Sequence, residues 1–129
     1  MRIPAGWQAS VRPADGVTVL TSLPVLNRND NPERIRLPRG GVYIWIFEYR
    51  GVRVSGVPRR PIRSNLGEKQ MHACGFGEGY MLYFTDHGRL LQVFVKLGPS
   101  TDKRTALAVL NSLRVTASSS NQPGLPSSG

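Results

Sequence analysis

The chain carries the stretch Tyr80-Met81-Leu82-Tyr83-Phe84-Thr85, then Asp86-His87-Gly88, then Arg89-Leu90-Leu91-Gln92-Val93-Phe94-Val95-Lys96-Leu97. The outer blocks are rich in aromatic and β-branched residues and predict two strands, and the short polar block between them predicts a tight turn. Pro99-Ser100-Thr101-Asp102 then opens a segment in which apolar residues recur at helical spacing up to Ser112-Leu113. We expect Ser100 or Thr101 to cap this helix. The stretch 79–115 therefore predicts an α+β fold, a twisted antiparallel sheet with a C-terminal helix packed on one face.

Residues 42–49 form the strongest strand upstream of this stretch, and their two faces differ in kind. Aliphatic residues at positions 42, 44 and 46 alternate with Tyr43, Trp45, Phe47 and Tyr49. In a strand this alternation places the aromatic side chains on one side and the aliphatic ones on the other. A β-branched run predicts another strand at residues 17–23, and residues 52–54 are a candidate return arm of a hairpin. In the strand 89–97 we expect the face of Leu90, Gln92, Phe94 and Lys96 to be part exposed.

Length and composition indicate one domain over residues 1–115, followed by a disordered Ser/Pro/Gly-rich tail or linker at 116–129. The formal net charge is +9, and most of the excess arginines lie between positions 28 and 63. Such a surface attracts nucleic acid, anionic lipid or acidic polysaccharide, with an affinity that salt weakens. The alternative is a solvated basic surface with no dedicated partner. The sequence does not identify the partner; another protein and a polyanion are the candidates.

Catalytic and metal-binding patterns are weak in this sequence. His72, Cys74 and His87 lack a fourth residue at metal-site spacing, and Cys74 has no orienting acid or oxyanion motif beside it. The carboxylates Glu68, Glu78 and Asp86 are not placed as a pair by any spacing. Residues 75–79 resemble a phosphate loop only superficially, because they precede a strand instead of a helix. We expect no enzyme, no metal and no cofactor. We also expect neither a signal segment nor an integral membrane segment in this chain.

Aromatic side chains set among arginines are the constellation with functional promise. Bases stack on aromatic rings while cationic side chains hold phosphates. The alternative is an aromatic layer buried beneath the helix. The candidate ligand-binding residues are Arg36, Arg39, Arg53, Arg59, Arg60, Arg63, Tyr43 and Trp45.

The opening Pro4-x-Gly6-Trp7, the paired central strands and the closing Val109-Leu110-Asn111-Ser112-Leu113-Arg114-Val115 together resemble the Mog1/PsbP-like fold. Within it the chain is similar to small extracytoplasmic domains of actinobacterial secreted or membrane-anchored proteins of unknown function. The resemblance implies core positions at Trp7 and Leu113, a turn and strand start at Gly88-Arg89, and no catalytic residue.

Two hypotheses of function follow. The first is a non-catalytic interaction module, the extracytoplasmic domain of an exported or membrane-anchored bacterial protein, with a basic arginine-rich binding surface. The alternative is a small nucleic-acid-binding domain that uses arginines and an aromatic strand face. The extracytoplasmic location comes from the resemblance; without it, the chain is expected in the cytoplasm.

Overall fold

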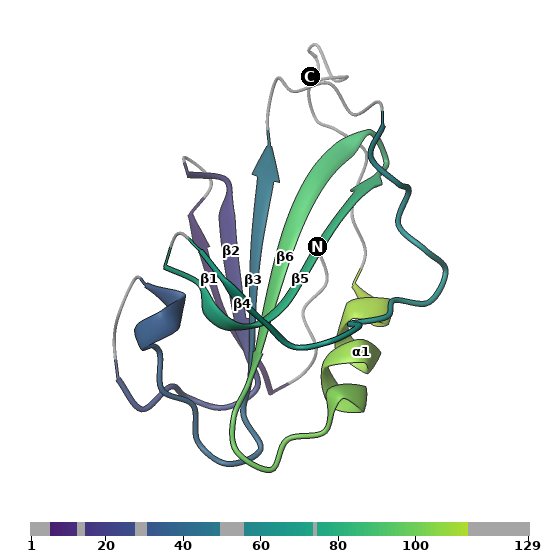
Figure 1. Cartoon of the computed structure of the whole chain (residues 1–129). Coiled ribbons are helices and arrows are strands. Elements are labelled where there is room, and N and C mark those ends of the chain that lie inside the picture. The colour runs from purple at the N-terminus through teal and green to yellow at the C-terminus, as the bar shows by residue number, and fades with distance from the viewer. Residues whose placement is uncertain (1–5, 13–14, 28–30, 50–55, 74, 114–129) are drawn as a thin grey trace.

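The computed structural model describes residues 6–12, 15–27, 31–49, 56–73 and 75–113, and they form a six-stranded antiparallel sheet with one helix (Figure 1). The strand order is β1-β2-β3-β6-β5-β4. This confirms the predicted α+β fold. The elements are β1 (Gln8–Arg12), β2 (Val17–Thr21), the 3-10 turn η2 (Pro32–Arg34), β3 (Val42–Tyr49), β4 (Gln70–His72), β5 (Gly77–Asp86), β6 (Arg89–Leu97) and α1 (Lys103–Ser112).

The predicted pair of strands with a tight turn between them forms the antiparallel hairpin of β5 and β6. Asp86 pairs with Arg89 across the turn, and Tyr80 pairs with Val95. His87 and Gly88 both have positive φ, of 50° and 78°, as a tight turn that matches the strand twist requires. The strand 89–97 was predicted with its observed bounds, whereas β5 begins three residues before the predicted Tyr80. Its early start includes Gly79, where a Cβ would lie 2.6 Å from the Phe94 ring.

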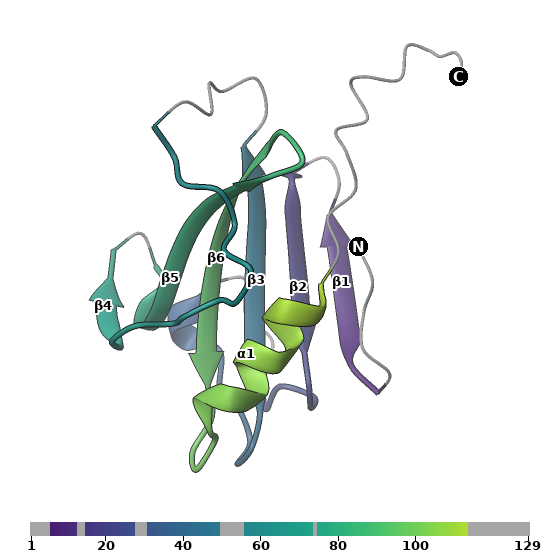
Figure 2. The same cartoon turned by 90° about the vertical axis from the view of Figure 1, so that its right-hand side faces the viewer.

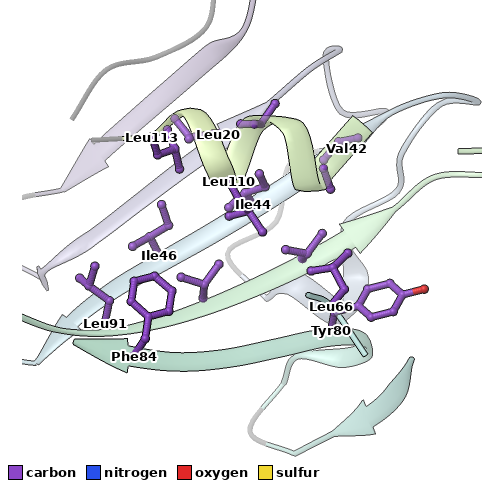
Figure 3. Packing of buried hydrophobic residues seen from close by; sticks show 14 residues of the cluster. Leu20, Val42, Ile44, Ile46, Leu66, Tyr80, Phe84, Leu91, Leu110 and Leu113 are labelled. Atoms are coloured by element: carbon purple, nitrogen blue, oxygen red, sulfur yellow. The ribbon is translucent and has the colours of Figure 1, made fainter. Parts of the chain in front are cut away.

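The helix packs on one face of the sheet, over β3 (Figure 2). Ile44 and Ile46 of β3 share a buried cluster with Ala106, Val109 and Leu110 of α1 (Figure 3). Because side chains alternate along a strand, the aromatic residues of β3 point to the opposite face of the sheet. The interpretation of an aromatic layer beneath the helix is therefore wrong.

The N-terminus of α1 differs from the prediction. Asp102 is the N-cap, and its side chain accepts a 2.8 Å hydrogen bond from the backbone N–H of Arg104. Ser100 and Thr101, the predicted caps, lie before it, and the Thr101 hydroxyl donates to the carbonyl of Gly41 instead. Leu113 ends the helix as its C-cap and is 3% exposed, which confirms the core position that the resemblance implies.

A second buried cluster lies on the other face of the sheet. Ile35 and Leu37 pack there on Tyr43 and Phe94. We call residues 31–37, which include η2, the strap. Because Phe94 is fully buried and Gln92 is 6% exposed, the prediction of a part-exposed face for β6 is wrong except at Lys96.

Several sequence predictions concern other parts of the chain. The predicted strand at 17–23 ends at Thr21, and β1 and β4 were not predicted. Trp7 is half-buried and packs against the first cluster. The candidate return arm at 52–54 and the tail 116–129 lie outside the described residues. Within the described part of the chain, no helix has the length and apolar character needed to cross a membrane.

Candidate functional site

The aromatic side chains of β3 form a continuous row across the sheet face that α1 leaves uncovered. The Tyr49 and Phe47 rings meet edge to face, with centroids 4.7 Å apart, and Phe47 stacks on Trp45 at 5.9 Å. Trp45 in turn meets the edge of Phe76 at 4.8 Å. Trp45, Phe47 and Tyr49 are half-buried. Each of these three rings thus contacts one or two neighbouring rings and keeps part of its surface accessible. We call Trp45, Phe47 and Tyr49, with the adjoining Tyr83, the aromatic face.

The strap closes one end of this row. Lys96 of β6 donates hydrogen bonds from its Nζ to the carbonyl oxygens of Pro32, Glu33 and Ile35, at 2.9, 3.2 and 2.6 Å. Burial lowers the pKa of Lys96, an effect that the nearby Glu33 carboxylate opposes. Under this anchored segment Tyr43 is only 4% exposed. Of the two predicted aromatic site residues, Trp45 is therefore part accessible and Tyr43 is a core residue.

At the other end of the row, three side chains from adjacent strands are hydrogen-bonded. The Tyr49 hydroxyl donates to Gln92 Oε1 at 2.8 Å, and Gln92 Nε2 donates to the Tyr83 hydroxyl at 2.9 Å. Tyr49, Gln92 and Tyr83 belong to β3, β6 and β5 in that order. Tyr83 is 50% exposed and extends the aromatic face onto β5. This hydrogen-bonded set was not predicted from the sequence, nor was the part of Tyr83 in the aromatic face. The alternation of side chains along β5 does place Tyr83 and Met81 on the same side of the strand.

Two exposed arginines belong to the strap. Arg36 is exposed although its neighbours Ile35 and Leu37 are buried against the sheet, so its side chain points away from the sheet. Arg34 ends η2 and is also exposed. Asn27 holds both residues in place, because its side-chain amide donates to the Arg34 carbonyl at 2.8 Å and accepts from the Arg36 N–H at 2.7 Å. These two cations therefore lie on the same side of the sheet as the aromatic face.

The other predicted arginines are placed elsewhere. Arg39 is exposed and donates to the Ser100 hydroxyl at 2.8 Å, in the loops before β3 and α1. Arg59 and Arg63 are exposed on the segment that runs past the end of β5 to α1. Arg60 of the same segment is turned inward. Arg53 lies outside the described residues.

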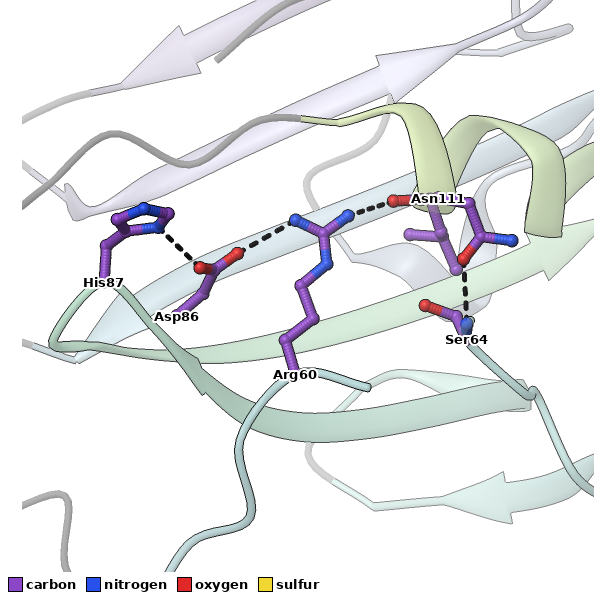
Figure 4. Close-up of polar contacts among 6 residues, drawn as sticks. Arg60, Ser64, Asp86, His87 and Asn111 are labelled. Atoms are coloured by element: carbon purple, nitrogen blue, oxygen red, sulfur yellow. Dashed lines mark hydrogen bonds and ion pairs between the residues drawn. The ribbon is translucent and has the colours of Figure 1, made fainter. Parts of the chain in front are cut away.

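Arg60 contacts three groups at once, and Figure 4 shows its two polar contacts. Its Nη1 donates to Asp86 Oδ2 at 2.9 Å, its Nη2 donates to the Leu110 carbonyl, and its guanidinium lies 5.7 Å from the centroid of the Phe84 ring. The side chains of Arg60 and Asp86 are 16% and 15% exposed. Arg60 thus connects the segment to β5 and α1 on the helix side of the sheet, and its role is structural.

The weaker candidates of the sequence are dispersed. His72 pairs with Gly77 at the start of β5, and His87 follows its end, so roughly 30 Å of strand separates them. Glu78 lies 3.7 Å from Lys69 in an exposed ion pair, and Asp86 is engaged with Arg60. Cys74 lies outside the described residues. Within the ranges that the structure describes, no three His, Cys, Asp or Glu side chains gather as a metal site would require.

Fold and site together define a class: an α+β protein whose antiparallel sheet has one face under a helix and the other face lined by accessible aromatic side chains. Comparisons of the chain with protein-family models, with curated proteins and with solved structures find no match. The resemblance to the Mog1/PsbP-like fold stays a prediction.

Proposed function

We propose that this protein is a non-catalytic binding module that holds single-stranded nucleic acid on its aromatic face. The observation that carries the proposal is the position of Trp45, Phe47, Tyr49 and Tyr83, which are part accessible on the side of the sheet that the helix does not cover. Rings held rigidly on a sheet offer flat surfaces to bases, and each stacked base contributes about 1–3 kcal/mol.

The row of rings is preorganised for such stacking. Edge-to-face contact with Tyr49 and stacking on Trp45 fix the Phe47 ring, and the buried Gln92 side chain holds both tyrosine hydroxyls. Side chains that are already ordered lose little conformational entropy when a ligand binds. This supports a face that binds without rearrangement.

The charge distribution supports a polyanionic ligand. The chain carries +9, and the strap, on the same side of the sheet as the aromatic face, carries the exposed Arg34 and Arg36. Guanidinium groups bind phosphates through paired hydrogen bonds. A strand whose bases stack on the rings would bring its phosphates toward these arginines.

The interaction module of an exported or membrane-anchored bacterial protein is the second candidate. The exposed Arg63 favours it, because this arginine is next to Ser64, which donates to Asn111 of α1, and so lies near the helix and away from the aromatic face. Its extracytoplasmic location follows from the resemblance alone. The two candidates differ in ligand, in surface and in the arginines that they need.

The test is a titration with a short single-stranded oligonucleotide, followed by tryptophan fluorescence over a series of salt concentrations. Replacing Trp7, on the helix side, by Phe makes Trp45 the only tryptophan, because the chain has two. We expect the oligonucleotide to quench Trp45 and the quenching to persist at physiological salt. Binding at low salt alone, or binding without quenching, would contradict the proposal.

Two pairs of variants locate the ligand. Tyr83→Ala should weaken binding by about fivefold or more, whereas Met71→Ala, at an exposed position on the other face of β4, should leave it unchanged. Replacing Arg34 and Arg36 together by Gln should reduce the slope of log affinity against log salt by about 1.4, since each phosphate contact on a single strand adds about 0.7. Replacing Arg63 by Gln should leave the slope nearly as it was.

A further inference from the structure

Arg59 lies beside the aromatic face, at the end of β5 that is remote from the strap. It forms a parallel bridge with Thr85. The Thr85 N–H donates to the Pro58 carbonyl at 2.9 Å, and the Arg60 N–H donates to the Thr85 carbonyl at 2.8 Å. Bridged residues point to the same side of a sheet, and Thr85 is two residues beyond Tyr83 in β5. The Arg59 side chain therefore points to the side of the aromatic face.

The neighbouring Arg60 supports this direction, because successive side chains alternate. It points to the helix side, where it reaches Asp86 and the Leu110 carbonyl (Figure 4). Arg59 is exposed and forms no ion pair with any described residue. Diagonal neighbours on one face of paired strands, such as Arg59 and Tyr83, lie about 7–8 Å apart, within reach of a long side chain. A guanidinium that no carboxylate neutralises thus lies next to the aromatic face.

The carboxylates at this end of the sheet point to the other side. Glu48 lies on the helix side of β3 and accepts a 2.9 Å hydrogen bond from Arg89, and Asp86 accepts one of 2.9 Å from Arg60. Of the described residues of β3, β6 and β5 that point to the side of the aromatic face, none is acidic. A polyanion that crosses this face therefore meets cations at the strap and at Arg59, and no repelling charge from these strands between them.

The register gives the distance that such a ligand must span. Thr85 pairs with Leu90, and Leu90 pairs with Tyr49, so Arg59 lies three strand spacings across the sheet from β3 and four residues along from Trp45. With about 4.8 Å between strands and about 3.3 Å per residue, this diagonal is roughly 20 Å. A single strand advances about 3.4 Å per nucleotide when it is stacked and about twice that when it is extended. About four to seven nucleotides therefore reach from Trp45 to Arg59.

We infer that the ligand of the aromatic face is a strand of about four nucleotides or more, which runs diagonally from the strap to Arg59. Arg59 binds the phosphate beside the base that stacks on Tyr83. This inference rests on the proposed function and adds the length and the path of the ligand to it. A mononucleotide or a dinucleotide can stack on one ring, but it cannot reach the arginines at both ends.

The test compares oligothymidylates of about two to ten nucleotides, with binding measured by the quenching of Trp45 in the protein whose Trp7 is replaced by Phe. Arg59→Gln should weaken the binding of the longest oligonucleotides about fourfold at physiological salt and lower their salt slope by about 0.7. The shortest ones should bind both proteins alike. The side chain of Arg59 takes no part in the backbone bonds of the bridge, so the substitution should leave the segment in place.

Two controls locate the phosphate. Arg63→Gln removes the same charge from the same segment, next to Ser64 and α1, and should leave the slope nearly as it was. In the Tyr83→Ala protein the loss caused by Arg59→Gln should shrink below about twofold, because a strand that does not stack there no longer holds its phosphate beside Arg59. Arg36→Gln, at the other end, should cause the same loss with or without Tyr83.

The outcomes separate this inference from the proposed function. Equal effects of Arg59→Gln and Arg63→Gln would overturn the inference, and so would a loss from Arg59→Gln that is the same for short and long oligonucleotides. In both cases the quenching of Trp45 by the unsubstituted protein's ligand would still support the aromatic face as a binding site. If no oligonucleotide of any length quenches Trp45, the proposed function fails, and the inference fails with it.

Discussion

Arg60 donates a 2.9 Å hydrogen bond to Asp86, across the gap between the segment at 58–64 and the end of β5. The same guanidinium bonds the Leu110 carbonyl near the end of α1. One side chain thus ties a segment without regular structure to the sheet and to the helix. The backbone N–H of Ser64 also donates a hydrogen bond to Asn111, so the segment is fixed at two points. The positive charge of Arg60 therefore stabilises the fold and is not available to a ligand.

We expect Arg60→Met to lower the free energy of unfolding by roughly 1.5–3 kcal/mol, the cost typical of losing hydrogen bonds to a charged group. The substitution keeps an apolar chain against Phe84 but leaves the Asp86 carboxylate without its cation. Urea unfolding followed by circular dichroism measures the change. Arg63→Met is the matched control, because Arg63 is exposed, and it should change the stability by less than about 0.5 kcal/mol. Equal effects of the two substitutions would show that Arg60 does not anchor the segment.

Leu110→Ala should destabilise the protein by roughly 2–5 kcal/mol, because it opens a cavity between α1 and the sheet. Leu110 is 3% exposed and packs in the cluster of Ile44 and Ile46. Leu26→Ala makes the same chemical change at a side chain that is 60% exposed, so it should have little effect. The urea midpoints of the two variants give the comparison. A loss of stability in Leu110→Ala as small as that in Leu26→Ala would contradict the packing of α1 on the sheet through Leu110.

The parts of the fold that local sequence determines were predictable. The strands β3 and β6 and the turn at His87-Gly88 follow from runs of β-branched and aromatic residues and from one polar break. β1 and β4 were not, because five and three residues of ordinary composition become strands only through pairing with their neighbours. The alternation of β3 predicted two unlike faces. It could not predict which of them the helix covers, since that depends on the connection from β6 to α1.

The candidate site was predictable in composition but not in arrangement. The aromatic stripe named both Trp45 and Tyr43 as candidates. Trp45 is half-buried, yet Tyr43, two residues away, is buried because the strap packs over it. Tyr83 joins the face through Gln92 of a third strand, a contact that no spacing along the chain reveals. Arg60 and Arg63 are close in sequence and differ in role, because only Arg60 faces Asp86 and the helix end.

The helix cap gives a prediction about pH. The side-chain hydrogen bond from Arg104, with its backbone N–H, lowers the pKa of Asp102 below the ordinary 3.8. As pH falls, the unfolded chain therefore takes up this proton first. The stabilising contribution is complete above the ordinary pKa and is lost as pH falls through the lower value of the folded protein.

Asp102→Asn isolates this effect, because Asn also accepts a hydrogen bond as an N-cap but has no charge. We expect a lower urea midpoint for the variant at neutral pH and a difference that shrinks as pH falls below about 4. Urea unfolding at a series of pH values measures it. A difference that stays constant from neutral pH to acid would mean that the charge of Asp102 contributes nothing.

Lys96→Met tests the strap as the cover of Tyr43. The variant keeps the apolar chain of Lys96 but leaves the carbonyl oxygens of Pro32, Glu33 and Ile35 without their shared donor. We expect the free energy of unfolding to fall by roughly 1.5–3 kcal/mol.

The same variant should change the accessibility of the aromatic face. With Trp7 replaced by Phe, the quenching of Trp45 by acrylamide should rise in the Lys96→Met protein, because Trp45 packs beside the cluster that the strap covers. Lys69→Met is the matched control, since Lys69 is exposed and lies 3.7 Å from Glu78 in a surface ion pair. Such pairs contribute about 1 kcal/mol or less, so stability and quenching should hardly change. If Lys96→Met left the quenching of Trp45 as it is, the strap would keep its place through its other contacts, among them Ile35, Leu37 and the bonds to Asn27, and the lysine would not be its anchor.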